Sequence, residues 1–136
     1  MTEVSSSTTL PIAAEKVWEM IRGFGQIGDW HPAVESCTLE EGGTVRRMKI
    51  PGGGEIVESL ERHEDDQMTF TYKIVSSPLP VANYESTVRV VPDGDGCKIH
   101  WTGQFDAVGP EDKASKIVKG IYDGGFEGIK KAWGIS

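Results

Sequence analysis

The sequence predicts an α+β fold in which a seven-stranded, curved antiparallel sheet wraps around one long C-terminal helix, with two short helices after the first strand. Three observations lead to this prediction. Apolar and polar residues alternate in a series of short segments, turn-forming residues separate these segments, and the C-terminal region carries an apolar stripe at helical spacing. Alternation is typical of a half-buried strand, whereas an apolar residue at every third or fourth position is typical of a helix.

Strand-like alternation is clearest in residues 68–74, which place Met, Phe, Tyr and Ile on one face and Thr and Lys on the other. Residues 98–105 alternate in the same way, and residues 84–90 do so more loosely. Turns rich in glycine, such as 51–54 and 92–96, separate the segments and suit hairpins. The remaining strands are expected near residues 3–9, 34–40, 44–50 and 55–63. Consecutive hairpins of this kind predict an antiparallel meander.

Helical periodicity appears in two regions. Residues 11–21 carry Ala, Val, Trp and Ile on one helix face, and a second short helix is expected to end at Trp30-His31-Pro32. The longer region runs from Glu111 to about Trp133 and has a broad apolar stripe. Because this helix is the only element able to cover the concave face of a curled sheet, we expect a space at one end where a small molecule can bind.

Composition limits the classes of function. The 136 residues, 38% hydrophobic and 26% charged, are expected to form one domain over residues 1–136. A formal charge of −7 argues against binding to nucleic acid and to an anionic membrane surface. No apolar run is long enough to predict membrane insertion. The N-terminus does not resemble a signal peptide, and Cys37 and Cys97 suit a reducing compartment, so we expect a cytoplasmic monomer or homodimer.

Several aromatic residues are candidates for lining the expected cavity. Trp30 and His31 would lie at its mouth, where His31 could shuttle a proton near neutral pH. Alternatively, Trp30 packs in the core. Aromatic walls with a few polar groups are the usual lining of a small-ligand pocket, and we therefore also consider Phe70, Tyr72, Tyr84 and Trp101. Ordinary core packing is the competing interpretation for each of them.

Glu58 is a candidate catalytic residue together with His31. It lies between Ile56 and Leu60 on the face of its strand that parity makes apolar. A carboxyl group there would be desolvated, which raises its pKa toward the range of a general acid or base. Arg89 is a possible partner from another strand. The alternative is that both charges are solvated.

The loop over residues 76–83 is longer than a tight hairpin needs, and Leu79 and Pro80 give it a stiff, apolar tip. Such a tip suits a lid over the cavity, although it could equally pack on the rim of the sheet. In the long helix, residues 119–128 contain four glycines, which disfavour a helix. We expect Ile121 and Gly125 to contact a ligand; close helix–sheet packing would explain the glycines equally well.

No motif predicts a metal or cofactor. The Gly52-Gly53-Gly54 run lacks the Lys-Ser/Thr pair of a phosphate-binding loop. The histidines and cysteines do not have the spacing of metal ligands.

Three stretches resemble a known superfamily. They are residues 10–32, with the pattern Pro-x-x-x-x-x-Val-Trp followed by Trp-His-Pro, the Leu-Pro loop at 76–84, and residues 101–106 running into the glycine-containing helix. Together they resemble the helix-grip superfamily of birch-pollen-type allergens, START domains and bacterial polyketide cyclases or dehydratases, and most closely the small bacterial polyketide-cyclase-like branch.

This resemblance implies a helix-grip fold that binds a small hydrophobic ligand, such as a lipid, polyketide or aromatic metabolite, between the sheet and the C-terminal helix. An alternative that it implies is a cyclase or dehydratase that uses acid and base groups in the same cavity. A third is a protein-interaction module resembling the chaperone activators of the superfamily, which would need an exposed apolar patch.

Overall fold

The computed structural model describes residues 1–135, and its elements follow the expected order along the chain. In this part of the chain the elements are β1 (Thr2–Leu10), α1 (Ala14–Ile21), η1 (Phe24–Asp29), β2 (Ser36–Glu40), η2 (Glu41–Gly43), β3 (Val45–Lys49), β4 (Glu55–Glu64), η3 (Asp65–Gln67), β5 (Thr69–Ser76), β6 (Val81–Asp93), β7 (Gly96–Ala107) and α2 (Glu111–Ala132). The three η elements are short 3₁₀ helices.

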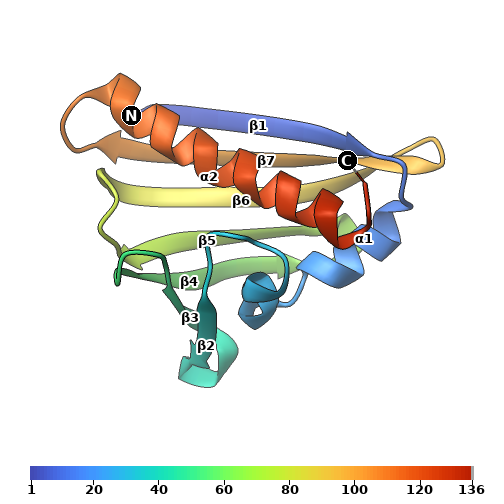
Figure 1. Cartoon of the computed structure of the whole chain (residues 1–136), viewed down its shortest axis with the longest axis horizontal. Helices are drawn as coiled ribbons and strands as arrows, with labels where there is room; N and C mark the ends of the chain where they lie inside the picture. Colours follow the sequence, from blue (N-terminus) through green and yellow to red (C-terminus); the bar gives the residue numbers. More distant parts are fainter. Residues whose placement is uncertain (136) are drawn as a thin grey trace.

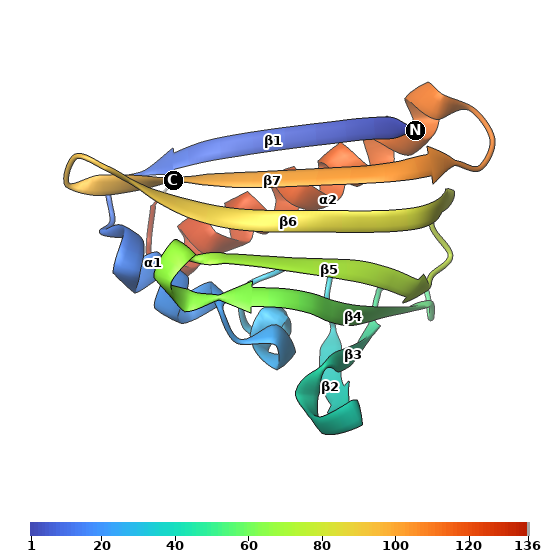
Figure 2. The same ribbon diagram turned by 180° about the vertical axis from the view of Figure 1, so that it is seen from behind.

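The strands form one antiparallel sheet in the order β1-β7-β6-β5-β4-β3-β2. Each strand from β2 to β6 pairs with the next strand in sequence, which confirms the predicted meander, and β1 pairs with the last strand, β7. Helix α2 lies across one face of this sheet (Figure 1). The view from behind shows that, among the described residues, no helix covers the opposite face of the sheet (Figure 2).

Helix α2 holds the sheet through its apolar side. Val118 and Ile129, which belong to the predicted apolar stripe, are buried. Tyr122 and Phe126, which the predicted stripe did not include, are buried as well, whereas Ala132 at its end is exposed. Ile117 belongs to the same stripe but is only partly buried, since it borders a cavity. None of the helices within residues 1–135 has the long apolar stretch that a membrane-spanning helix requires.

The second short helix is the 3₁₀ element η1 rather than an α-helix. Gly25 and Gly28 lie within it, and glycine has a poor α-helix propensity. The η1 element contacts α1, β2 and β3, and both short helices lie below the C-terminal half of α2 in the view of Figure 1. The segment that follows η1 therefore reaches α2, which brings His31 close to the helix.

Candidate functional site

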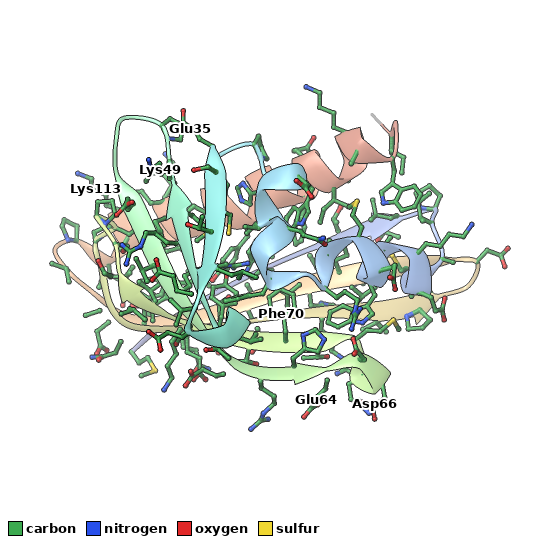
Figure 3. The ribbon with its side chains drawn as sticks, turned by 90° about the horizontal axis from the view of Figure 1, so that it is seen from below. Glu35, Lys49, Glu64, Asp66, Phe70 and Lys113 are labelled. Carbon is green, nitrogen blue, oxygen red and sulfur yellow. The ribbon has the colours of Figure 1, made fainter. Side chains whose placement is uncertain are left out.

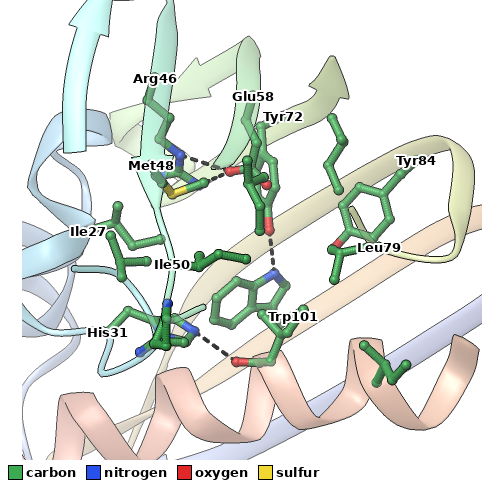
Figure 4. Close-up of a pocket in the computed structure, with 17 residues that line it drawn as sticks. Ile27, His31, Arg46, Met48, Ile50, Glu58, Tyr72, Leu79, Tyr84 and Trp101 are labelled. Atoms are coloured by element: carbon green, nitrogen blue, oxygen red, sulfur yellow. Dashed lines mark hydrogen bonds and ion pairs between the residues drawn. The ribbon is translucent and has the colours of Figure 1, made fainter. Parts of the chain in front are cut away.

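A cavity of about 230 Å³ lies between the concave face of the sheet and α2 (Figure 4). Its wall is mainly apolar, with a small number of polar side chains. The lining residues are Ile27, His31, Ala33, Val34, Arg46, Met48, Ile50, Pro51, Ile56, Glu58, Tyr72, Ile74, Leu79, Tyr84, Trp101, Ile117 and Ile121. Those that are partly exposed, including Val34, Ile50 and Leu79, mark its mouth.

Most of the residues singled out in the sequence lie around this cavity. They are His31, Glu58, Tyr72, Leu79, Tyr84, Trp101 and Ile121. They come from separate elements, and the curvature of the sheet together with the crossing of α2 brings them to one place (Figure 4). Their role in binding remains a prediction.

Four other candidates lie outside the lining. Trp30 is buried with its ring edge against Trp101, at 6.3 Å between ring centroids. Phe70 lies in the interior, with 6.0 Å between its ring centroid and that of Trp18. By contrast, Glu64, at the end of β4 where the hairpin to β5 begins, points outward (Figure 3). The carbonyl of Pro80 accepts a hydrogen bond of 2.9 Å from the backbone of residue 108, at the rim of the sheet.

Gly125, the fourth of these, serves close packing rather than making room for a ligand. A Cβ atom at this position would lie 2.6 Å from the ring of Trp101 and 3.1 Å from that of His31. A Cβ atom at Gly128 would overlap the carbonyl oxygen of Trp30. Of the two interpretations that the glycines allowed, these positions favour close contact between α2 and the rest of the fold.

Glu58 is buried at the cavity wall, so the alternative that it is solvated is wrong. Its partner is Arg46, which lies directly opposite on β3. Nε and Nη2 of Arg46 donate hydrogen bonds of 2.9 and 2.7 Å to the same carboxylate oxygen, Oε1. The suggested partner, Arg89, is exposed on the outer face of β6 and pairs in register with Thr69 and His100. Because Arg89 alternates with Val88 and Val90, strand parity already predicted that its side chain points outward.

The sequence analysis missed Arg46, although a signal was present. Arg46 shares strand parity with Met48 and Ile50, whereas Arg47 has the opposite parity. The buried guanidinium group lies 4.0 Å over the ring of Phe24 and donates a hydrogen bond of 3.0 Å from Nη1 to the carbonyl of that residue. Aromatic stacking and three hydrogen bonds thus compensate for burying the arginine.

Burial raises the pKa of Glu58, and the charge of Arg46 opposes this effect. Both hydrogen bonds from Arg46 reach Oε1, so the second oxygen, Oε2, has no hydrogen-bond partner within residues 1–135. Because Glu58 lines the cavity, this oxygen is available to a molecule inside it.

His31 is held as a neutral imidazole by two backbone groups. A carbonyl oxygen can only accept, so the contact of 2.9 Å between Nε2 and the Ile121 carbonyl requires a proton on Nε2. Nδ1 accepts a hydrogen bond of 3.1 Å from the backbone of Ala33. Burial lowers the pKa of His31 and favours the same neutral form. With both ring nitrogens bonded to backbone groups, His31 connects the loop after η1 to α2 and has no free nitrogen for proton transfer to a bound molecule.

A network of hydrogen bonds connects the aromatic side chains of the cavity wall to Ser86 and Tyr122. Trp101 Nε1 donates to Tyr72 Oη and Ser86 Oγ, both at 3.0 Å. Ser86 donates its own proton to the Thr102 carbonyl, so Tyr122 must donate to Ser86. Tyr122 in turn accepts from Tyr84. The direction of each hydrogen bond in the chain is therefore fixed.

Tyr72 is the exception in this network. An indole N–H is only a donor, so Tyr72 Oη accepts from Trp101 and keeps its own proton. Ser86, which shares the Trp101 donor, already accepts two hydrogen bonds and has no lone pair left. In the described part of the chain no other acceptor bonds to Tyr72, which leaves its O–H free to bond within the cavity.

A β-bulge helps to place Tyr84. The register of β6 against β7 shifts between Ala82 and Glu85, and Asn83 has a positive φ of 54°. Asparagine tolerates this conformation better than most residues, and its side chain donates a hydrogen bond of 2.9 Å to Asp106. The bulge accompanies the turn of the Tyr84 ring toward the cavity.

The family model for polyketide cyclase / dehydrase and lipid transport matches residues 1–134. The chain belongs to this family. Membership confirms the resemblance inferred from the sequence, and the fold is the expected helix-grip fold of hydrophobic ligand-binding proteins. Comparison with curated proteins gives no significant match.

Several solved structures have the same fold as this chain. A putative uncharacterized protein from Bacillus thuringiensis is 34% identical, with a TM-score of 0.93 over 96% of this chain and 98% of that chain. The protein XoxI from Bacillus cereus is also 34% identical, with a TM-score of 0.93 over 97% of this chain and 95% of that one. Norcoclaurine synthase from Thalictrum flavum is 20% identical, with a TM-score of 0.74 over 96% and 85%, and shares the fold alone.

Proposed function

We propose that this polyketide cyclase-family protein binds a small hydrophobic molecule in the cavity between the sheet and α2. The cavity itself, with its apolar wall and one buried polar corner, is the observation that carries the proposal. Lipids, polyketides and aromatic metabolites are the candidate classes.

The size of the cavity favours the smallest of these classes. A cavity of about 150 Å³ holds one benzene molecule, and this one has about 230 Å³. It therefore suits a molecule of one or two rings better than a whole lipid or a long polyketide chain. A two-ring aromatic group buries about 200 Å², which contributes about 5 kcal/mol before the costs of ordering are subtracted.

Native mass spectrometry of the purified protein tests this proposal directly. We expect a bound small molecule in the wild-type protein and in Lys116→Trp, which adds an indole on the exposed side of α2. We expect none in Ile121→Trp, because the larger side chain fills the cavity. A bound molecule that persists in Ile121→Trp, or a wild-type protein that takes up no hydrophobic molecule at all, would contradict the proposal.

A second candidate function is catalysis of the cyclase or dehydratase type. The observation in its favour is the buried carboxyl of Glu58, whose pKa is raised and whose Oε2 is accessible from the cavity. If this function is correct, Glu58→Gln removes turnover of a bound substrate while binding remains. Turnover that survives in Glu58→Gln would exclude Glu58 as the acid or base.

The structure does not favour the third hypothesis, a protein-interaction module. The strongly exposed large apolar residues of the described chain are Met1, Leu39, Val75 and Val108, and they belong to four separate segments. A hollow interior combined with scattered surface residues suits a ligand-binding protein better than an apolar docking patch.

The loop between β5 and β6 lies at the mouth of the cavity, with Leu79 in the lining. It meets the loop between β3 and β4, since a Cβ atom at Gly54 would lie 3.4 Å from Pro78. This position suits the predicted lid, and its movement remains a prediction.

A further inference from the structure

We propose that the molecule bound in this cavity is uncharged and carries a hydroxyl group, which donates a hydrogen bond to Oε2 of Glu58 while an oxygen of the same molecule accepts one from Tyr72. This inference rests on the proposed binding function and specifies the class of ligand.

The charged groups of the cavity lining are already paired with each other. Arg46 and Glu58 are the charged side chains in the lining, and each neutralises the other at 2.7 Å. His31 is held neutral by its two backbone contacts. A charged ligand would lose its hydration here without gaining a free opposite charge, which is costly in an apolar cavity. The lining therefore selects an uncharged molecule.

Two polar groups of the cavity lining have unused hydrogen-bonding capacity. Within the described residues Oε2 of Glu58 accepts no hydrogen bond, and the O–H of Tyr72 has no acceptor. A carboxylate oxygen needs a donor and a phenol O–H needs an acceptor. A hydroxyl group supplies both, whereas an ether or a ketone supplies only the acceptor. Water can fill these roles in the empty cavity, so a ligand must match them to displace it.

These two polar groups lie on the same side of the cavity (Figure 4). Glu58 and Tyr72 lie together on the sheet side of the cavity, away from α2 (Figure 4). The helix side and the mouth are apolar, with Ile117, Ile121 and Leu79. A ligand is thus expected to place its hydroxyl group against the sheet and its hydrocarbon part against the helix.

Three two-ring probes test the inference on the wild-type protein by isothermal titration calorimetry. Naphthol carries the hydroxyl group, methoxynaphthalene keeps the oxygen but lacks the donor, and naphthalene lacks both. We expect naphthol to bind at least about tenfold more tightly than either of the others, because they leave a buried polar group unpaired. The anion naphthoate and the cation naphthylmethylammonium are expected to bind at least about tenfold more weakly than naphthol.

Substitutions of Tyr72 and Glu58 test whether these residues cause the preference for naphthol. Tyr72→Phe is expected to reduce the preference for naphthol over naphthalene by about tenfold while the affinity for naphthalene changes little. Thr71→Val is the matched control, because it removes a hydroxyl from the opposite face of the same strand. Glu58→Gln is expected to act like Tyr72→Phe, and Glu55→Gln is its control, since Glu55 pairs with Arg47 on the outer face. If Glu58→Gln does not fold, Tyr72→Phe and the affinities of the wild-type protein for the probes still test the inference.

The outcomes separate this inference from the binding function. Equal affinities for naphthol and naphthalene, or a preference that Tyr72→Phe leaves unchanged, would overturn the ligand class while binding itself stands. Preferred binding of a charged probe, or a charged molecule carried by the native protein, would also overturn it. If no probe binds and the protein carries no small molecule, the proposed function fails, and the ligand class fails with it.

Discussion

Arg46 and Glu58 are direct cross-strand partners on β3 and β4, and their ion pair lies inside the fold. One residue further along β3, Arg47 forms an ion pair with Glu55 of the same neighbouring strand, at 3.2 Å on the exposed face. Side chains alternate across a sheet, so these two strands carry the same chemistry in two environments. The pair inside is expected to matter far more than the pair outside.

Replacing Arg46 tests this expectation. Arg46→Met leaves the Glu58 carboxylate buried and unpaired, and we expect it to lower the free energy of unfolding by about 3–5 kcal/mol near neutral pH. Arg47→Met removes the exposed ion pairs with Glu55 and Glu40 and should cost less than about 1 kcal/mol. Urea unfolding followed by tryptophan fluorescence measures both. The double variant Arg46→Met/Glu58→Leu should recover much of the loss, and equal effects of the two single variants would contradict the assignment.

The glycines of α2 provide a second test. A Cβ atom at Gly128 would overlap the Trp30 carbonyl, so Gly128→Ala should lower the free energy of unfolding by about 1–3 kcal/mol. Gly120 has open space around it, and Gly120→Ala should stabilise the protein by up to about 1 kcal/mol through helix propensity. Thermal unfolding distinguishes the two signs. A stabilising effect of Gly128→Ala would show that α2 does not need this close contact.

His31 should make stability depend on pH. Burial lowers its pKa below the usual value of about 6.5, so the unfolded chain binds more protons than the folded protein below that value. The stability associated with neutral His31 is therefore present above about pH 6.5 and is lost as the pH falls toward the folded pKa. His31→Gln should show a smaller loss of stability over this range in urea titrations. His100→Gln, on the outer face of β7, controls for removal of an imidazole. If His31→Gln lost as much stability as the wild type over this pH range, the prediction would be refuted.

Asp65 should act in a more acidic range. The guanidinium of Arg22 and the ring of His63 hold the pKa of Asp65 well below its usual range, and Trp18 Nε1 also donates to it. A lowered folded pKa gives a stability contribution that is present above the usual value of about 3.9 and is lost as the pH falls below it. Asp65→Asn should therefore have a lower urea midpoint than the wild type at pH 7, with a difference that shrinks below about pH 4. Asp66→Asn should not differ in this way.

Much of the fold could be predicted because each element has its own periodicity. The alternation in β5 and β7 places their apolar residues where the structure has them. The stripe of α2 predicted the burial of Val118 and Ile129 but omitted Tyr122 and Phe126. The bulge at Asn83 could not be predicted, since it depends on how β6 aligns with β7 rather than on local pattern. The 3₁₀ form of η1 did have a local signal, because Gly25 and Gly28 disfavour an α-helix there.

The site was only partly predictable, for a related reason. Parity placed Glu58 on the correct face, but the identity of its partner depends on the register between β3 and β4, which a sequence does not state. Trp30 and Trp101 are both aromatic candidates for the cavity wall from the sequence, yet one fills the core and the other borders the cavity. The tautomer of His31 follows from two backbone contacts that only the folded chain brings together.

The contact of Gly125 and Gly128 with Trp101 and the Trp30 carbonyl fixes one end of α2 against the body of the protein. A guest of different dimensions cannot be accommodated by lifting that end. Adaptation to bulkier or slimmer guests has to come from the other half of the helix, where Ile117 and Ile121 can be exchanged for smaller or larger side chains without disturbing the anchor. Redesign of this protein for new compounds should therefore begin with these two isoleucines.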